Sequence, residues 1–409
     1  MRFLFVTQYF PPEIGAPQVR LAAMARELVR LGHDVEVVTG LPNHPTGRIF
    51  PDYRGKFALT EEWEGIRVHR SWIYAATGAG WRRMLNYGSF ALTSLVGLLQ
   101  SKRPDYVFVE SPPLFVSVPA WLMCLAWRRP FIFNVADLWP DSVRELGLMR
   151  EGVMLRAAEW LEGWSYDRAT FVNAVTEGIR EDLRTKKHVP ERKLLFLPNG
   201  VDTELFKPGD PDAELAQSLG LEGKQVIVYA GTLGFAQGLD VGLAAMGAVR
   251  ESHPDARLVF IGDGSDRARL EKAARELRLD NVLFLPPNRP EYVARLYSFA
   301  VAGFAALKDL PLFEGARPSK IFPIMGCGRP VLYSGSGEGA RLVQAADAGF
   351  ITPPEDAPAL ATAIRALLDD PSLAARQGAN GRAYVERELS WRALVSDWLV
   401  QLHEARAAR

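Results

Sequence analysis

Cysteine is scarce in this chain of 409 residues, which contains only Cys124 and Cys327. Two cysteines are too few for a disulfide framework or for a zinc site built from cysteines. We therefore expect both cysteines to be small core residues of a protein that is kept in a reducing compartment.

Net charge is also absent, because 48 Lys and Arg residues balance 48 Asp and Glu residues. A protein that coats nucleic acid needs a basic excess, so we expect no nucleic-acid partner. The balance is uneven along the chain, since residues 1–200 carry a charge of +4 and residues 201–409 carry −4. Residues 1–103 alone carry +5, so the basic excess lies early in the chain.

Long apolar runs are missing as well. Residues 3–7 read as a strand rather than a signal peptide, and the longest uncharged run, residues 84–101, is too polar for a comfortable membrane span. Read as a helix, residues 81–103 have a broad apolar face with two basic residues at each end. Such a helix packs in the core of an α/β domain or lies in a membrane interface, and the pattern leaves both interpretations open.

What the chain does contain is a regular alternation of short apolar strands and helices, which restarts after the turn Pro198-Asn199-Gly200. Strands are predicted at residues 2–7, 34–39, 105–110, 131–135, 171–175 and 194–197, and then at 226–230, 258–261, 282–285, 301–307, 331–333 and 350–352. Fully apolar strands separated by helices indicate parallel sheets covered on both faces. The fold class is therefore α/β with two doubly wound domains, and the ligand site is expected in the cleft between them.

Glycine loops follow several predicted strands. Gly231 to Gly234 and Gly262 to Gly264 close neighbouring strands of the second domain, and Gly15-Ala16 opens the first helix. Backbone N–H groups at such turns suit a phosphate, although an ordinary tight turn is the alternative. Neither a dinucleotide fingerprint nor a P-loop is present.

Charged side chains accompany these loops. Arg317 and Lys320 flank Ser319, which we expect to cap the following helix, and together they form the best diphosphate site in the sequence. An ordinary capped helix with solvated basic residues is the alternative. Asp137 follows a predicted strand, where it can bind a sugar hydroxyl or act as a base, and Trp139 offers a stacking face. The triplet Asp210-Pro211-Asp212 is interpreted as surface rather than a metal site.

In their order along the chain, these motifs resemble those of the retaining nucleotide-sugar glycosyltransferases of family 4, which have the GT-B fold. The matching segments are Phe10-Pro11-Pro12-Glu13 with Gly15, residues 31–39, residues 198–202 with Phe206, residues 261–264 and residues 325–331. The resemblance covers essentially the whole chain. It implies an acceptor domain at residues 1–200, a nucleotide-sugar domain at residues 201–387, and a last helix at residues 388–409 that packs back on the first domain.

A narrower resemblance is to bacterial transferases of the WbuB type, on residues 41–47, 111–113, 137–140 and 318–320. It implies transfer of a sugar, such as an amino-deoxy sugar, to a glycan or polyprenyl-diphosphate-linked acceptor in surface polysaccharide assembly. The enzyme would then be cytoplasmic and peripheral on the inner membrane, with a UDP-linked donor and no metal or other cofactor.

The resemblance also implies site residues. Asp137 and Glu314 are the expected catalytic residues. The expected donor contacts are Gly15, Ala16, Thr232, Gln237, Gly262, Asp263, Pro286, Arg317, Ser319 and Lys320. The expected acceptor contacts are Asn43, His44 and Trp139.

The sequence departs from the family pattern at several of these positions. Pro323 replaces a glutamate that holds the ribose, Thr232 and Gln237 replace two phosphate-binding cations, and Ala136 replaces a cleft histidine. Two other functions therefore stay open. One is a nucleotide-sugar 2-epimerase of the same fold, and the other is a non-enzymatic nucleotide-sugar-binding protein.

Overall fold

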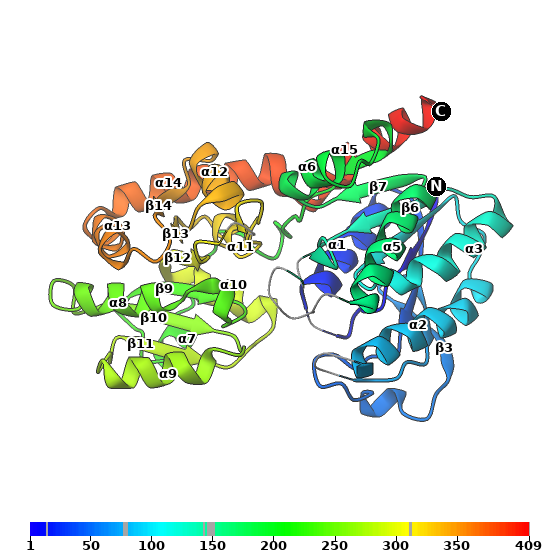
Figure 1. Ribbon diagram of the computed structural model, residues 1–409. Helices are drawn as coiled ribbons and strands as arrows, with labels where there is room; N and C mark the ends of the chain where they lie inside the picture. Colours follow the sequence, from blue (N-terminus) through cyan, green and yellow to red (C-terminus); the bar gives the residue numbers. More distant parts are fainter. Residues whose placement is uncertain (14, 77–80, 142–143, 145–151, 311–312, 409) are drawn as a thin grey trace. The chain divides into compact units, whose positions relative to one another are not determined.

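The chain folds as two compact units in a computed structural model (Figure 1). The structure describes residues 1–13, 15–76, 81–141, 144, 152–310 and 313–408. Unit 1 comprises Met1–Asn199 and Leu394–Arg409, and unit 2 comprises Gly200–Ala393. The last helix is thus grouped with the N-terminal domain, and each unit contains one sheet of its own.

The sheet of unit 1 has eight strands in the order β3-β4-β2-β1-β5-β6-β7-β8. The strands are β1 (Arg2–Val6), β2 (Asp34–Gly40), β3 (Ala58–Trp63), β4 (Ile66–Ser71), β5 (Tyr106–Ser111), β6 (Phe131–Val135), β7 (Phe171–Ala174) and β8 (Leu194–Phe196). All neighbours are parallel except β3 and β4. That antiparallel hairpin was not predicted, because its turn residues Glu64 and Gly65, at φ 48° and 79°, are not a standard hairpin pair.

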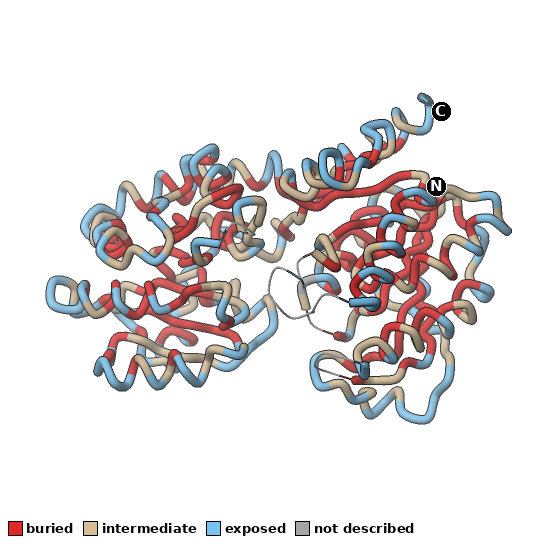
Figure 2. The backbone as a smooth tube through the Cα atoms, in the orientation of Figure 1, coloured by how far each residue is buried: buried red, intermediate tan, exposed pale blue. Residues whose placement is uncertain are grey.

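Helices cover both faces of this sheet. They are α1 (Ala16–Arg30), α2 (Trp81–Gln100), α3 (Ser117–Trp127), α5 (Val153–Arg168), α6 (Glu177–Thr185) and α15 (Trp391–Ala407). Side chains alternate along β1, so that Leu4 and Val6 join a core with α2, α3 and α5, while Phe3 faces Trp398 of α15 on the other side. Figure 2 shows the strands as a buried layer between these helices.

A chain of buried polar side chains crosses the sheet of unit 1. Arg20 of α1 pairs with Glu110 of β5, whose carboxylate accepts 2.7 Å from Asn134 of β6. Asn173 of β7 donates to Asn134 at 2.6 Å and accepts from the indole N–H of Trp398 at 3.1 Å. The last helix is therefore fastened to β7 of this sheet by a hydrogen bond as well as to β1 by aromatic packing.

The sheet of unit 2 has six parallel strands in the order β11-β10-β9-β12-β13-β14. Its strands are β9 (Gln225–Ala230), β10 (Ala256–Ile261), β11 (Val282–Leu285), β12 (Ala300–Ala306), β13 (Val331–Ser334) and β14 (Gly349–Thr352). Its helices are α7 (Ala213–Ser218), α8 (Asp240–Val249), α9 (Arg267–Glu276), α10 (Pro290–Phe299), α11 (Ile321–Gly326), α12 (Gly337–Ala345), α13 (Ala357–Asp369) and α14 (Pro371–Tyr384). The prediction of two parallel α/β sheets is confirmed.

We expect replacement of Trp398 by alanine to destabilise unit 1 strongly, because this side chain is fully buried and donates a buried hydrogen bond. Truncation of such a residue costs about 3–5 kcal/mol of unfolding free energy. Thermal and urea unfolding measure the change. The matched control is Trp160→Ala on α5, where the indole is 67% exposed and a change below about 0.5 kcal/mol is expected. Equal effects of both substitutions would contradict the prediction.

Candidate functional site

Two glycine loops meet at the carboxyl ends of β9 and β10 in unit 2. Gly231 donates to the carbonyl of Ile261 at 2.9 Å, and Leu233 donates to the carbonyl of Asp263 at 2.9 Å. A Cβ atom on Gly262 would overlap the carbonyl oxygen of Gly231, and Gly262 has a φ of 148°. Only glycine fits there, so the two loops form one rigid surface as expected from the sequence.

Lys320 lies directly over this surface. A Cβ atom on Gly231 would be 2.5 Å from Cε of Lys320, and the ammonium nitrogen is 5.7 Å from the centre of the Tyr229 ring. No carboxylate in the described part of the chain pairs with this half-buried ammonium, and burial lowers its pKa to about 8. An unpaired cation at the ends of parallel strands is suited to a phosphate oxygen.

Arg317 is placed differently from the sequence expectation. Its guanidinium is mostly buried and pairs with the Glu338 carboxylate of α12 at 3.1 Å. The charge of Arg317 is therefore offset by Glu338 rather than solvated, and its contact with a diphosphate stays a prediction. Its partner lies on a helix beyond the next strand, so nothing in the local sequence indicated the pair.

Ser319 does not cap the following helix, which corrects a second expectation. Helix α11 begins at Ile321 after Lys320, no side chain caps it, and Ser319 is exposed. The turn is instead closed by the carbonyl of Pro318, which accepts from Ile321 at 3.1 Å. Pro323 fits the first turn of this helix because its missing N–H would have no partner within the helix.

Glu314 was expected to contact the donor sugar. In the structure its carboxylate is 62% exposed and 3.2 Å from the guanidinium of Arg341 on α12. Its backbone carbonyl accepts from Glu338 at 2.9 Å, which ties this loop to the start of α12. Glu314 is thus held at the protein surface by its own partner.

The remaining donor candidates of unit 2 surround the glycine loops. Thr232 is exposed, and its carbonyl accepts from the Tyr229 hydroxyl at 2.6 Å. Gln237 accepts from the N–H of Gly234 at 3.2 Å, and Asp263 accepts from that of Gly264 at 2.8 Å. Pro286 is exposed directly after β11. Thr232 and Pro286 are therefore accessible, whereas Gln237 and Asp263 also stabilise the loops.

In unit 1, a buried carboxylate organises the loops that follow β1 and β2. One oxygen of Glu13 accepts from the backbone N–H groups of Asn43 and His44, both at 2.8 Å, and the other accepts from Phe10 at 3.3 Å. Burial raises the pKa of Glu13 to about 7. The fully buried Arg70 of β4 donates to the Pro11 carbonyl and pairs with Glu61 at 2.5 Å. These groups hold the two loops together.

The predicted acceptor residues take different positions around the loops that Glu13 holds together. Asn43 is 1% exposed and its side chain donates to the Leu41 carbonyl at 2.9 Å, so it supports the loop, and its contact with an acceptor stays a prediction. The half-buried His44 ring stands edge-on to Tyr9 at 5.5 Å between centres. Gly15 precedes Ala16, the first residue of α1, and its carbonyl accepts from Val19 at 3.0 Å.

Asp137 and Trp139 follow β6. Asp137 is exposed, and its carbonyl accepts from the Trp139 N–H at 2.9 Å. Trp139 is half-buried against the core of unit 1, so its ring is not free for stacking on both faces. Of these two residues, Asp137 is the accessible one, and it offers a carboxylate at this end of the sheet.

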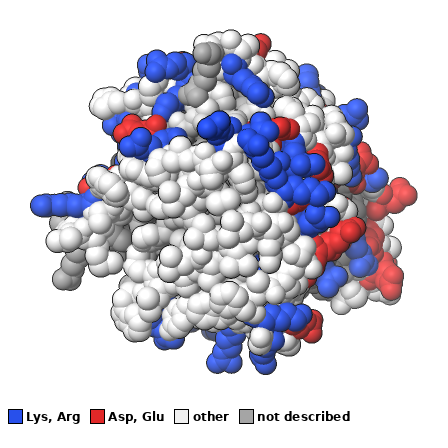
Figure 3. All heavy atoms as spheres, turned by 90° about the vertical axis from the view of Figure 1, so that its right-hand side faces the viewer, with Lys and Arg blue, Asp and Glu red and all other residues white. Residues whose placement is uncertain are grey.

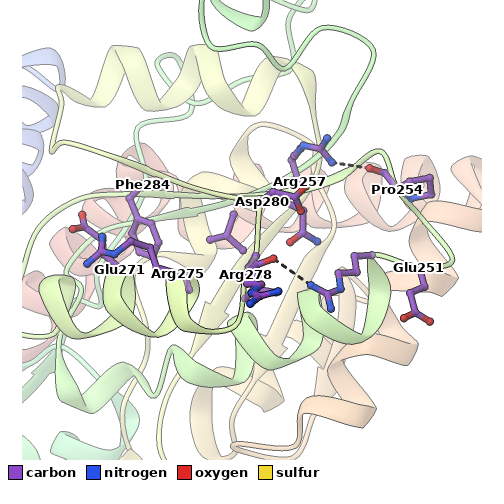
Figure 4. A pocket seen from close by; sticks show the side chains of 13 residues that line it. Glu251, Pro254, Arg257, Glu271, Arg275, Arg278, Asp280 and Phe284 are labelled. Carbon is purple, nitrogen blue, oxygen red and sulfur yellow. Dashed lines mark hydrogen bonds between the residues drawn. The ribbon is translucent and has the colours of Figure 1, made fainter.

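A separate hollow of about 890 Å³ lies along α9 and the edge strand β11 (Figure 4). Its wall carries Arg250, which donates to the Arg278 carbonyl at 3.2 Å, and Arg257, which donates to the Pro254 carbonyl at 2.8 Å. Residue Asn281, which precedes β11, also lines it. The glycine loops follow the carboxyl ends of β9 and β10 and contribute no residue to this hollow, so the hollow is no part of the candidate site.

Comparison with known proteins places both units in known families. Residues 15–200 match the family model "Glycosyl transferase 4-like domain", and residues 211–384 match "Glycosyl transferases group 1". The chain is a GT-B glycosyltransferase of the group 4-like family. The family named from the sequence motifs is therefore confirmed.

Individual relatives of this glycosyltransferase are moderately similar. WcaI of Escherichia coli, a putative colanic acid biosynthesis glycosyl transferase, is 26% identical over 80% of this chain and 82% of its own length. An alpha-D-kanosaminyltransferase of Streptomyces kanamyceticus is 27% identical over 54% of this chain and 57% of its own length.

Solved structures share the fold. Sucrose-phosphate synthase from Thermosynechococcus elongatus has a TM-score of 0.77 and 20% identity, with both chains covered completely. Anabaena HepE in complex with UDP-glucose has a TM-score of 0.71 and 18% identity, covering 99% of this chain and 100% of that one.

Sequence reasoning missed several site-forming residues of this glycosyltransferase. Glu13 belongs to a recognised motif, but its role as a clamp depends on a loop thirty residues away. Glu338 and Arg70 lie on elements that only the folded chain brings to the loops. Within the DxD triplet, Asp212 caps α7 and pairs with Arg295 at 2.5 Å. No cluster of three or more potential metal ligands was found among the described residues.

We expect the Glu13→Gln variant to change how stability depends on pH. The folded chain holds a proton on Glu13 up to about pH 7, whereas the unfolded chain releases it near pH 4.5. The contribution of Glu13 to the wild-type free energy of unfolding must therefore decrease as pH rises from about 5 to 7. The Gln variant, which does not titrate at this position, should lack this decrease. Unfolding midpoints at several pH values measure the difference. Parallel profiles for the two proteins would contradict the assignment.

Proposed function

We propose that this glycosyltransferase transfers a sugar from a nucleoside diphosphate-sugar held by unit 2 to an acceptor held by unit 1. The observation that carries the proposal is the ammonium of Lys320, which lies over the Gly231 loop and pairs with no carboxylate among the described residues. A diphosphate oxygen there would gain a charged hydrogen bond and would compensate the half-buried Lys320 ammonium for its lost hydration. Exposed Thr232, whose N–H has no acceptor among the described residues, offers a second contact.

The chemistry proposed for this site is transfer with retention at the anomeric carbon. The bond from that carbon to the diphosphate breaks, a bond to an acceptor oxygen forms on the same face of the sugar, and the acceptor hydroxyl passes its proton to an oxygen of the leaving diphosphate. The leaving diphosphate gains negative charge, which Lys320 stabilises without a metal ion. Asp137 would orient the acceptor, and the amides at Gly15 and Ala16 would contact the donor phosphates.

For the substrates, we propose a UDP-linked sugar, with amino-deoxy sugars among the candidates, and a polyprenyl-diphosphate-linked or glycan acceptor at the cytoplasmic face of the inner membrane. The name of WcaI, which refers to colanic acid biosynthesis, and the solved complex of HepE with UDP-glucose support this choice. A GDP-mannose-dependent mannosyltransferase of Corynebacterium glutamicum, 32% identical over 48% of this chain, makes GDP-sugars the second donor set to test.

A screen of UDP- and GDP-sugars by thermal shift, followed by mass spectrometry of products, tests the function. A donor that raises the unfolding temperature and modifies a lipid-linked acceptor supports the proposal. Release of a 2-epimer of the donor without an acceptor would instead identify an epimerase. Binding without turnover on any acceptor would favour a nucleotide-sugar-binding protein, and an inverted anomeric centre would overturn retention.

We expect Lys320→Met to reduce the affinity for the nucleoside diphosphate at least tenfold, because the substitution keeps the chain length but removes the charge. Wild-type affinity should also fall from pH 7 to pH 9, since the free ammonium has a pKa of about 8, whereas the variant should lack this part of the dependence. Calorimetry with UDP measures both effects. The control is Lys272→Met on α9, whose exposed ammonium is 3.6 Å from Glu276. Unchanged binding by Lys320→Met would refute the phosphate assignment.

A further inference from the structure

Helix α2 turns a stripe of large apolar side chains toward solvent. Trp81, Leu85, Leu92 and Leu99 are 68%, 49%, 73% and 71% exposed. At 3.6 residues per turn these four positions lie within about 40° of one another around the helix axis. They therefore form one continuous line along the helix rather than scattered exposed residues.

The buried side of α2 contains polar and small residues as well as the apolar Phe90 and Leu98. Asn86 is fully buried and donates to the Tyr74 carbonyl at 2.8 Å, and buried Ser94 donates to the Ala91 carbonyl at 2.8 Å. A Cβ atom on Gly97 would be 2.9 Å from a methyl group of Val38, so the helix packs closely there. A surface helix normally buries its leucines and exposes its polar groups. Packing within unit 1 does not account for the outward leucines.

Neighbouring α3 extends this apolar surface. Helices α2 and α3 contact each other, and Leu122 and Leu125 of α3 are 49% and 56% exposed. We call Trp81, Leu85, Leu92, Leu99, Leu122 and Leu125 the α2–α3 face. Figure 3, viewed from the side of these helices, shows a broad area without charged side chains and with Lys and Arg along parts of its edge. Apolar patches of this breadth mark interaction sites.

The segments that contain α2 and α3 themselves carry charges of one sign, although Arg129 at their edge pairs with Asp105 at 3.8 Å. Residues 81–103 and 117–129 contain Arg82, Arg83, Lys102, Arg103, Arg128 and Arg129 and no Asp or Glu. Arg103 donates to the Trp127 carbonyl, so basic residues from the ends of both helices gather at one end of the face. A second copy of this chain would bring a second set of cations against the first. An anionic surface, by contrast, is complementary to this set.

We propose that the α2–α3 face docks flat on an anionic phospholipid bilayer. Helix α2 would lie in the plane of the interface, with its leucines at the level of the acyl chains and its terminal basic residues among the headgroups. No helix in the described ranges is long and apolar enough to cross a membrane. Docking would bring a lipid-linked acceptor to unit 1. Its biological role therefore rests on the proposed function.

Sedimentation of the full chain with vesicles tests the proposal without any sugar donor. We expect binding to vesicles of phosphatidylglycerol and phosphatidylcholine, and at least tenfold weaker partitioning of the triple variant Leu92→Gln, Leu99→Gln, Leu122→Gln. The matched control replaces the exposed Val29, Leu277 and Val400 by glutamine outside the face and should bind like the wild type. Unfolding midpoints check that both variants fold.

A second triple variant, Arg82→Gln, Lys102→Gln, Arg128→Gln, tests the charge. It should bind anionic vesicles less tightly and with a weaker dependence on salt. Wild-type binding by the leucine variant, or equal wild-type binding to pure phosphatidylcholine, would overturn the proposal. So would a wild-type dimer that the leucine substitutions convert to a monomer. Measuring donor binding by the leucine variant separates membrane docking from the proposed glycosyl transfer, because vesicle binding can be lost while UDP-sugar binding persists.

Discussion

The close contact between the glycine loops of unit 2 is the constraint on which the donor side of the molecule depends. A side chain on Gly262 would overlap the Gly231 carbonyl, and one on Gly264 would overlap that of Leu233. Because both positions have φ values that only glycine adopts readily, the two strand ends can be joined by backbone hydrogen bonds. This leaves the Lys320 side chain as the group that lies over the loops, and its charge is the basis of the phosphate site that we propose there.

The loops at the corresponding end of unit 1 are built from charges that are already satisfied. Glu13 accepts three backbone N–H groups, and Arg70 is shared between Glu61 and the Pro11 carbonyl. Burying ionisable groups costs free energy unless they are hydrogen-bonded, and here the bonds determine loop shape. The contrast with Lys320 is informative. The fully buried Arg70 holds loop structure, whereas the half-buried Lys320 pairs with no carboxylate in the described part of the chain.

Much of the fold could be read from the sequence, because apolar strands and amphipathic helices alternate with clear periods, and glycine loops mark strand ends. The site was less predictable, since a side chain's availability depends on partners distant in sequence. Arg317 looked free until α12 brought Glu338 to it, and Asn43 looked exposed until its loop closed on Glu13. The β3–β4 hairpin was missed because an edge strand with charged residues and a Glu-Gly turn lacks the standard signals.

The same limit applies to α2, where the sequence left a core helix and an interfacial helix open. Apolar residues lie all around this helix, so periodicity alone cannot say which of them face the sheet. The structure shows Phe90 and Leu98 inward and Leu92 and Leu99 outward. That orientation shows where part of the basic excess of residues 1–103 lies, because the cations of residues 81–103 flank the outward leucines. An overall charge of zero therefore conceals a local arrangement in which apolar contact and positive charge favour the same flat, anionic partner.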